Sequence, residues 1–207
     1  ESGLDMNAEG EAVSNQLREN GAKPYFIPGG GSNAVGALGY VSCALELISQ
    51  FDLNSIKFDC LIQATGSTGT QAGLVSGLCA LSSELPVLGI SVRQNCERQI
   101  DAVWKLVRET VEKLNTNDIK RDKILVDDNY IGKGYAIPTD GTLEAIDLLA
   151  KTEGILLDPV YSGKAMAGLI DMVRKGNFNH NEKILFLHTG GSAALFAYEQ
   201  ELTKFSK

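Results

Sequence analysis

The strongest constraint on the fold is a regular alternation of short apolar runs with segments of helical periodicity. The run "KFDCLIQA" (57–64) is almost continuously apolar, as in a parallel strand that is buried on both faces of a sheet. Three further runs, at 86–92, 122–128 and 183–189, have the same character. Repeated strand–loop–helix units predict an α/β fold with three layers, in which a mostly parallel, twisted sheet carries helices on both faces.

The segments between these runs have apolar residues at helical spacing. They predict helices at about 9–20, 35–51, 70–82, 97–114, 140–152 and 163–175. A further short strand is predicted at 23–28, "KPYFIP".

The composition excludes several classes of protein. With 43% hydrophobic and 22% charged residues, the chain resembles an ordinary soluble domain. A net charge of −7 offers no basic patch for a nucleic-acid partner. No uninterrupted apolar stretch reaches the roughly 18 residues of a membrane helix, and the start "ESGLDMNAEGE" is not a signal peptide. Four cysteines without a C-x-x-C pair indicate free thiols, so we expect a cytoplasmic protein with neither nucleic-acid nor membrane partners.

Three junctions combine glycine with serine or threonine: "IPGGGSNAVGALG", "ATGSTGTQAGL" and "HTGGSAALFAY". Each is expected where the carboxyl end of a strand meets a helix. In open α/β sheets this edge is where ligands bind. The three loops therefore predict one shared polar crevice.

The loop Thr65-Gly66-Ser67-Thr68-Gly69-Thr70 carries the clearest chemistry. Its glycines let backbone N–H groups turn inward, and the N-terminus of the next helix adds partial positive charge that suits a phosphate. The loop lacks the lysine of a nucleoside-triphosphate loop, because Thr70 and Gln71 follow the last glycine. Its glycine spacing also differs from the dinucleotide fingerprint. A single phosphate monoester is the predicted ligand.

A second cluster lies in "LLDPVYSGKAMAGLID", where Tyr161 and Ser162 precede a helix of small residues. Taken alone, Tyr161 and the tyrosine of "KGYAIP", Tyr135, fit an aromatic of the core or rim better than an acid–base group. His188 ends the last strand, and a structural or orienting role is favoured over a general base.

Five segments in this order resemble one known family: "IPGGGSNAVGALGY", "TGSTGTQAGL", "GYAIPTDGTLEAI", "LLDPVYSGKAMAGLID" and "ILFLHTGGSAALFAY". The chain resembles the D-cysteine desulfhydrase and 1-aminocyclopropane-1-carboxylate deaminase family, whose fold is similar to the tryptophan synthase β subunit (fold type II). The resemblance implies pyridoxal 5'-phosphate as cofactor, with the phosphate at Thr65–Thr70. It also implies that Tyr135 and Tyr161 are active-site tyrosines, that Ser162 faces the pyridine nitrogen, and that Thr189 is its neighbour.

The last two positions distinguish two reactions. The deaminases resemble this chain but have Glu and Leu there, whereas the desulfhydrases have hydroxyl residues. A carboxylate stabilises the protonated ring that opening of a cyclopropane requires, while a hydroxyl can bond a neutral nitrogen. Ser162 and Thr189 therefore favour β-elimination of D-cysteine to pyruvate, ammonia and hydrogen sulfide. Cyclopropane deamination, elimination of sulfite from cysteate and a non-catalytic module that binds a phosphorylated ligand or a partner subunit remain alternatives.

The resemblance also implies a domain division. Residues 1–34 correspond to part of a smaller domain and 35–207 to the large cofactor-binding domain. The family's lysine that forms a Schiff base with the cofactor precedes the first residue of this chain, and Lys164 matches a non-anchoring position. We expect one part of a longer enzyme that is inactive alone, acts on a small amino acid and works as a homodimer.

Overall fold

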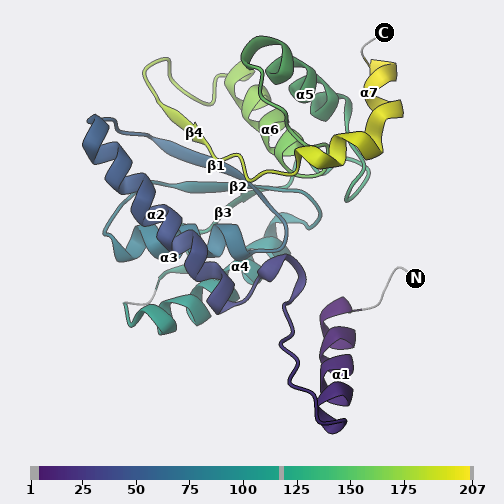
Figure 1. Ribbon diagram of the computed structural model, residues 1–207. Coiled ribbons are helices and arrows are strands. Elements are labelled where there is room, and N and C mark those ends of the chain that lie inside the picture. Colours follow the sequence, from purple (N-terminus) through teal and green to yellow (C-terminus); the bar gives the residue numbers. More distant parts are fainter. Residues whose placement is uncertain (1–4, 117–118, 206–207) are drawn as a thin grey trace.

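A parallel sheet forms the centre of the molecule (Figure 1). The computed structural model describes residues 5–116 and 119–205. Its four strands are β1 (Cys60–Thr65), β2 (Val87–Ser91), β3 (Leu125–Asp127) and β4 (Ile184–Phe186), in the order β3-β2-β1-β4. Each neighbouring pair is parallel, with Ile62 opposite both Leu88 and Phe186.

Helices cover both faces of this sheet, so the predicted three-layer α/β architecture is confirmed (Figure 1). One face carries α2 (Ala34–Asn54), α3 (Gly69–Ala80) and α4 (Cys96–Leu114). The other carries α5 (Asp140–Glu153) and α6 (Ser162–Arg174), with α7 (Glu199–Phe205) beside α5. Helix α1 (Met6–Glu19) stands away from the sheet and joins α2 through an extended segment. Short 3-10 helices span Gly29–Gly31, Arg121–Lys123 and Ser192–Tyr198.

The strand side chains alternate between two apolar cores. Leu61 and Val87 pack with α3 and α4, whereas Ile62 and Ile90 pack with Ala165 of α6. Both cores are closed to solvent at these positions. The continuous apolar run of β1 is therefore explained by burial on both faces, as predicted.

The strand predicted at 23–28 is wrong. This segment is irregular, and no strand of the described residues pairs with it. Tyr25 and Ile27 are 74% and 68% exposed, and Pro24 and Pro28 offer no N–H for a ladder. Its apolar residues satisfied the sequence pattern, but a strand also requires a paired neighbour.

Helix α2 packs closely against α3. A Cβ on Gly77 would lie 2.7 Å from Ala44 Cβ, and one on Gly73 would lie 2.5 Å from Tyr40 Cβ. By length and composition alone α2 could cross a membrane, because one 18-residue window has a mean hydropathy of 1.4. The search for an uninterrupted apolar stretch did not identify this predicted helix as a candidate membrane span, because glycine and serine interrupt its apolar residues. One such helix is weak evidence for a membrane span, since core helices of soluble proteins pass the same test.

Candidate active site

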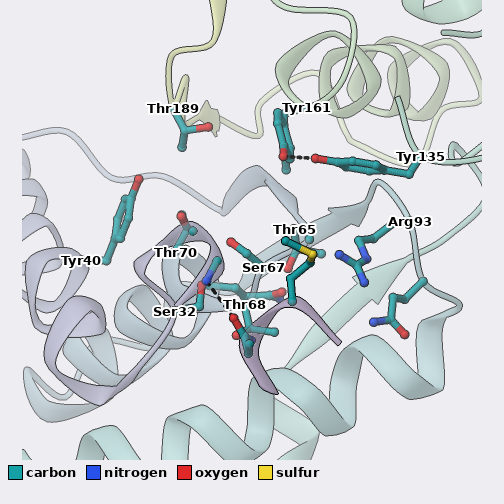
Figure 2. A pocket seen from close by; sticks show the side chains of 18 of the residues that line it. Ser32, Tyr40, Thr65, Ser67, Thr68, Thr70, Arg93, Tyr135, Tyr161 and Thr189 are labelled. Carbon is teal, nitrogen blue, oxygen red and sulfur yellow. Dashed lines mark hydrogen bonds between the residues drawn. The ribbon is translucent and has the colours of Figure 1, made fainter. Parts of the chain in front are cut away.

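A cavity of about 890 Å³ opens at the carboxyl edge of the sheet (Figure 2). All three glycine–hydroxyl loops reach it, which confirms the predicted shared crevice, although the first loop follows an irregular segment rather than a strand. Its lining includes Gly30, Ser32, Tyr40, Thr65, Gly66, Ser67, Thr68, Thr70, Gln71, Arg93, Tyr135, Tyr161 and Thr189.

The predicted phosphate loop connects β1 to the N-terminus of α3. All its predicted residues except Gly69 line the cavity, and their hydroxyl groups gather there (Figure 2). Thr68 is the N-cap of α3 and has a left-handed backbone, with φ +80°, while its side chain makes no capping hydrogen bond. Its hydroxyl and the helix N-terminus are therefore available to an anion.

The loop before α2 closes over the phosphate loop. The backbone N–H of Gly69 donates to Ser32 Oγ at 3.1 Å, so this amide is already engaged. Gly30 has φ +68°, and a Cβ there would overlap Ser67 Oγ. Only glycine permits this approach, which explains one residue of the "GGG" run. The individual contact of Ser32 was missed, because no local pattern indicates a partner 37 residues away.

Two buried glutamines fix the phosphate loop and the helix that follows it: Gln99 bonds the loop, and Gln71 bonds α3 to the sheet. Gln99 Nε2 donates to Thr65 Oγ1 at 2.9 Å and to the Gly66 carbonyl at 3.4 Å. Since the carbonyl can only accept, the amide nitrogen must face both groups, and the proton of the Thr65 hydroxyl stays free for a ligand. Gln71 Nε2 donates to the Leu125 carbonyl at 2.7 Å. A polar Gln99 on the apolar stripe of α4, one turn before Val103, is the sequence signal that could have identified it.

A tyrosine pair forms another wall of the cavity. The hydroxyl groups of Tyr135 and Tyr161 share a hydrogen bond, and their ring centroids lie 5.9 Å apart at 68° (Figure 2). Burial, followed by the hydrogen bond with Tyr135, raises the pKa of Tyr161 to about 12. The phenol therefore keeps its proton at neutral pH. Arg93, which the sequence reasoning missed, lies with its guanidinium 5.9 Å from the Tyr135 ring centroid.

Ser162 and Thr189 have different surroundings. Thr189 lines the cavity and is exposed. Ser162 is only 1% exposed and does not line it: Ser162 Oγ donates to Asp158 Oδ1 at 2.7 Å and accepts from the Asp158 backbone N–H at 2.8 Å. The hydroxyl proton of Ser162 is thus donated to Asp158 and not into the cavity.

Asp158 organises this turn and was also missed from the sequence. It is fully buried, and its carboxylate accepts backbone N–H groups from Val160, Tyr161 and Ser162 at 2.7–2.8 Å. These bonds satisfy amides at the start of α6. Asp158 thereby holds the backbone at Tyr161, the N-cap of α6.

Lys164 and His188 have structural contacts. Lys164 is fully buried, and Nζ donates to the carbonyls of Ile131 and Gly134, so this amine does not face the cavity. The Gly190 N–H donates to His188 Nδ1 at 2.9 Å, which leaves Nε2 to donate to the Leu156 carbonyl, also at 2.9 Å. His188 links the end of the last strand to the segment before Asp158, in agreement with the predicted orienting role.

This chain is similar to one protein family and to several solved structures. A family model described as "pyridoxal-phosphate dependent enzyme" matches residues 2–190. The structure of an ACC deaminase homologue is similar, with a TM-score of 0.88 and 36% identity over 99% of this chain and 61% of that chain. A hydrogen sulfide-producing enzyme from Fusobacterium nucleatum has a TM-score of 0.57 and 20% identity, over 94% of this chain and 62% of that one.

A fungal L-serine ammonia-lyase from Rhizomucor miehei has a TM-score of 0.54 and 17% identity, over 81% of this chain and 56% of that chain. Like the enzyme from Fusobacterium nucleatum, it shares the fold alone. The chain spans less than two thirds of the length of each of these structures.

Proposed function

Because the chain belongs to the family of pyridoxal-phosphate-dependent enzymes, we propose that it forms the phosphate-binding part of a lyase for cysteine-like amino acids. The reaction is β-elimination of D-cysteine to pyruvate, ammonia and hydrogen sulfide. One observation carries the proposal: a hydroxyl-lined loop at a helix N-terminus shares one cavity with a hydrogen-bonded tyrosine pair. The loop suits the cofactor's phosphate, and the pair suits a leaving group that needs a proton.

The described residues fit the phosphate of the cofactor. Thr65, Ser67, Thr68 and Thr70 supply neutral O–H donors, and the start of α3 supplies partial positive charge. The cavity is within the size range of sites that take a cofactor and a small substrate. Among the described lining residues there is no lysine. We therefore propose that a further segment of the same enzyme supplies the amine that anchors the cofactor's aldehyde.

Bound pyridoxal phosphate supplies an electron sink that acidifies the α-proton of an amino acid. The protein's own part is then binding and proton transfer. The phosphate loop holds the anion, and Thr189 offers a hydroxyl at the opposite rim (Figure 2). Tyr161 or Tyr135 can act as the general acid, since a phenol that carries its proton can donate it to the leaving sulfur as the C–S bond breaks.

The main experiment assays the complete enzyme for pyruvate and sulfide from D-cysteine and for 2-oxobutanoate from the cyclopropane substrate. We expect the D-cysteine reaction to dominate. The double variant Ser162→Glu/Thr189→Leu should shift the ratio of the two kcat/KM values toward the cyclopropane substrate by about tenfold or more, a difference of about 1.4 kcal/mol. A carboxylate at position 162 cannot donate to Asp158 as the Ser162 hydroxyl does, so we expect it to turn away from Asp158 and toward the cavity. No shift would contradict the electronic argument, and no product from any substrate would favour the non-catalytic module.

One observation favours cysteate as a second candidate substrate. Arg93 is the one cationic side chain among the described lining residues, and no described carboxylate forms an ion pair with it. A guanidinium can bind a sulfonate with two parallel hydrogen bonds. If sulfite is the natural leaving group, Arg93→Ala should raise the KM for cysteate about tenfold or more while the KM for D-cysteine changes less than about twofold. Equal changes for both substrates would exclude a role for Arg93 in binding the sulfonate.

A further inference from the structure

Lys164 is the largest fully buried side chain of the described residues. Lysine is almost never fully buried unless its charge is paired. Here the partners are two main-chain carbonyls: Nζ donates to Ile131 O at 2.7 Å and to Gly134 O at 2.8 Å. In the described part of the chain no carboxylate forms an ion pair with Lys164.

Burying this ammonium group costs free energy unless its two hydrogen bonds offset the lost hydration. Lys164 lies in the first turn of α6, where the helix dipole opposes a positive charge. Burial also lowers the pKa of Lys164, which reflects the cost of removing the charge from water. Apolar side chains would fill the same space without this cost. The two carbonyls of the loop are the contacts that a lysine makes here and an apolar residue could not.

The segment that Lys164 holds has little regular structure. Residues 131–136 contain left-handed backbone at Gly132 (φ +70°) and at Ala136 (φ +60°). Besides Lys164, Tyr198 contributes a tether, because its hydroxyl donates to the Ala136 carbonyl at 2.7 Å. Tyr135 itself is 47% exposed. Core packing therefore does not place the Tyr135 ring; the position of its loop does.

The same end of α6 carries both partners. Tyr161 is the N-cap of α6, and Lys164 follows it by three residues, about one turn. We propose that Lys164 is a positioning residue: it holds the loop 131–136 against the start of α6, so that Tyr135 meets Tyr161 in the cavity. The effect on the tyrosine pair is independent of the substrate, whereas its consequence for turnover rests on the proposed function.

The first test observes the tyrosine pair directly. In the complete protein labelled with 3-fluorotyrosine, the fluorine resonance of Tyr161 is assigned with Tyr161→Phe. We expect Lys164→Met to move this resonance to the position that it takes in Tyr135→Phe. The first change displaces the Tyr135 hydroxyl from Tyr161 and the second deletes it, so both remove the hydrogen bond between the two tyrosines. Lys175→Met removes a charge from the other end of α6 and should leave the resonance in place. A wild-type resonance in Lys164→Met overturns the proposal.

The second test separates positioning from a general loss of structure. If Lys164 acts through Tyr135, the two substitutions are not additive: Lys164→Met and Tyr135→Phe each lower kcat/KM about tenfold, and the double variant falls less than about twofold further. Independent effects that multiply to about a hundredfold would contradict the proposal. If the wild-type enzyme shows no lyase activity, the proposed function fails, while the fluorine test still decides the role of Lys164.

Lys164→Met removes the donor to two partly buried carbonyls and can prevent folding. In that case Lys164→Gln takes its place, because its amide keeps N–H donors without the charge. The expected Tyr161 resonance is then displaced from the wild-type position toward that of Tyr135→Phe. An unchanged resonance in a folded Lys164→Gln variant overturns the proposal as well.

Discussion

At the scale of single residues, Thr68 combines backbone strain with a place in the site. A β-branched residue with φ +80° is an outlier, and such conformations cost about 1–3 kcal/mol. The surrounding structure maintains it where the hydroxyl of Thr68 and the start of α3 border the cavity. The strain at Thr68 thus lowers the stability of the fold at a position where the hydroxyl can donate a hydrogen bond to an anion.

We therefore expect Thr68→Gly to change stability and binding in opposite directions. Relief of strain should raise the free energy of unfolding by up to about 1 kcal/mol after the entropy cost of glycine. Loss of one hydroxyl donor should weaken binding of inorganic phosphate about tenfold, as expected for a hydrogen bond to a charged group. Urea unfolding and calorimetric titration measure the two effects. Ser82→Gly is the control, since it relieves a φ of +56° outside the described cavity lining and should not alter phosphate binding.

At the scale of elements, α3 is buried on nearly all sides, and its glycines set its distance from α2. Positions 73 and 77 face α2 with no room for a methyl group. Tyr40 of α2 packs on Gly73 and also lines the cavity. The spacing of two helices therefore determines the position of a site residue.

Gly73→Ala should destabilise the protein by about 1–3 kcal/mol, because the new methyl group overlaps α2. Gly39→Ala on α2 is the matched control. A Cβ there meets nothing within 4 Å, and alanine favours the helix by about 1 kcal/mol, so this variant should be slightly more stable. Chemical unfolding measures both free energies. Equal effects of the two substitutions would contradict the close-packing argument.

At the scale of the whole molecule, the cavity joins segments that are distant in the sequence. The loop before α2, the phosphate loop, the Tyr135 loop and the segment after β4 all contribute to its wall. An occupant that contacts several of them stabilises their shared arrangement, because it binds the folded state and not the unfolded one.

Pyridoxal phosphate should therefore raise the midpoint of thermal unfolding of the complete enzyme, and its removal by dialysis should reverse the increase. At a concentration about 100 times Kd the stabilisation is about 2.7 kcal/mol. Pyridoxal, which lacks the phosphate, should give a much smaller increase if the loop at 65–70 supplies the main contacts. Equal increases from the two compounds would show that the loop does not bind the phosphate. Differential scanning calorimetry provides the measurement.

The sequence by itself determined the layered fold and the nature of the main loop. Apolar runs and helical periodicity are local signals, so they predicted the α/β class, the four strands of the sheet and helices α1 to α6 within a few residues of their observed bounds, whereas α7 was not predicted. Glycines with hydroxyl residues after "CLIQA" predicted an anion site for the same reason, since backbone freedom and donor chemistry belong to the residues themselves.

Only the tertiary structure decided which groups meet. The strand order, the bond of Ser32 to Gly69 and the burial of Lys164 depend on segments distant in sequence, as does the fact that no described strand pairs with 23–28. Local periodicity carries no information about such contacts. Lys164 illustrates the difference: the family resemblance matches it to a non-anchoring position, but its contact with the Tyr135 loop exists only after the chain has brought residues 30 positions apart into hydrogen-bond distance.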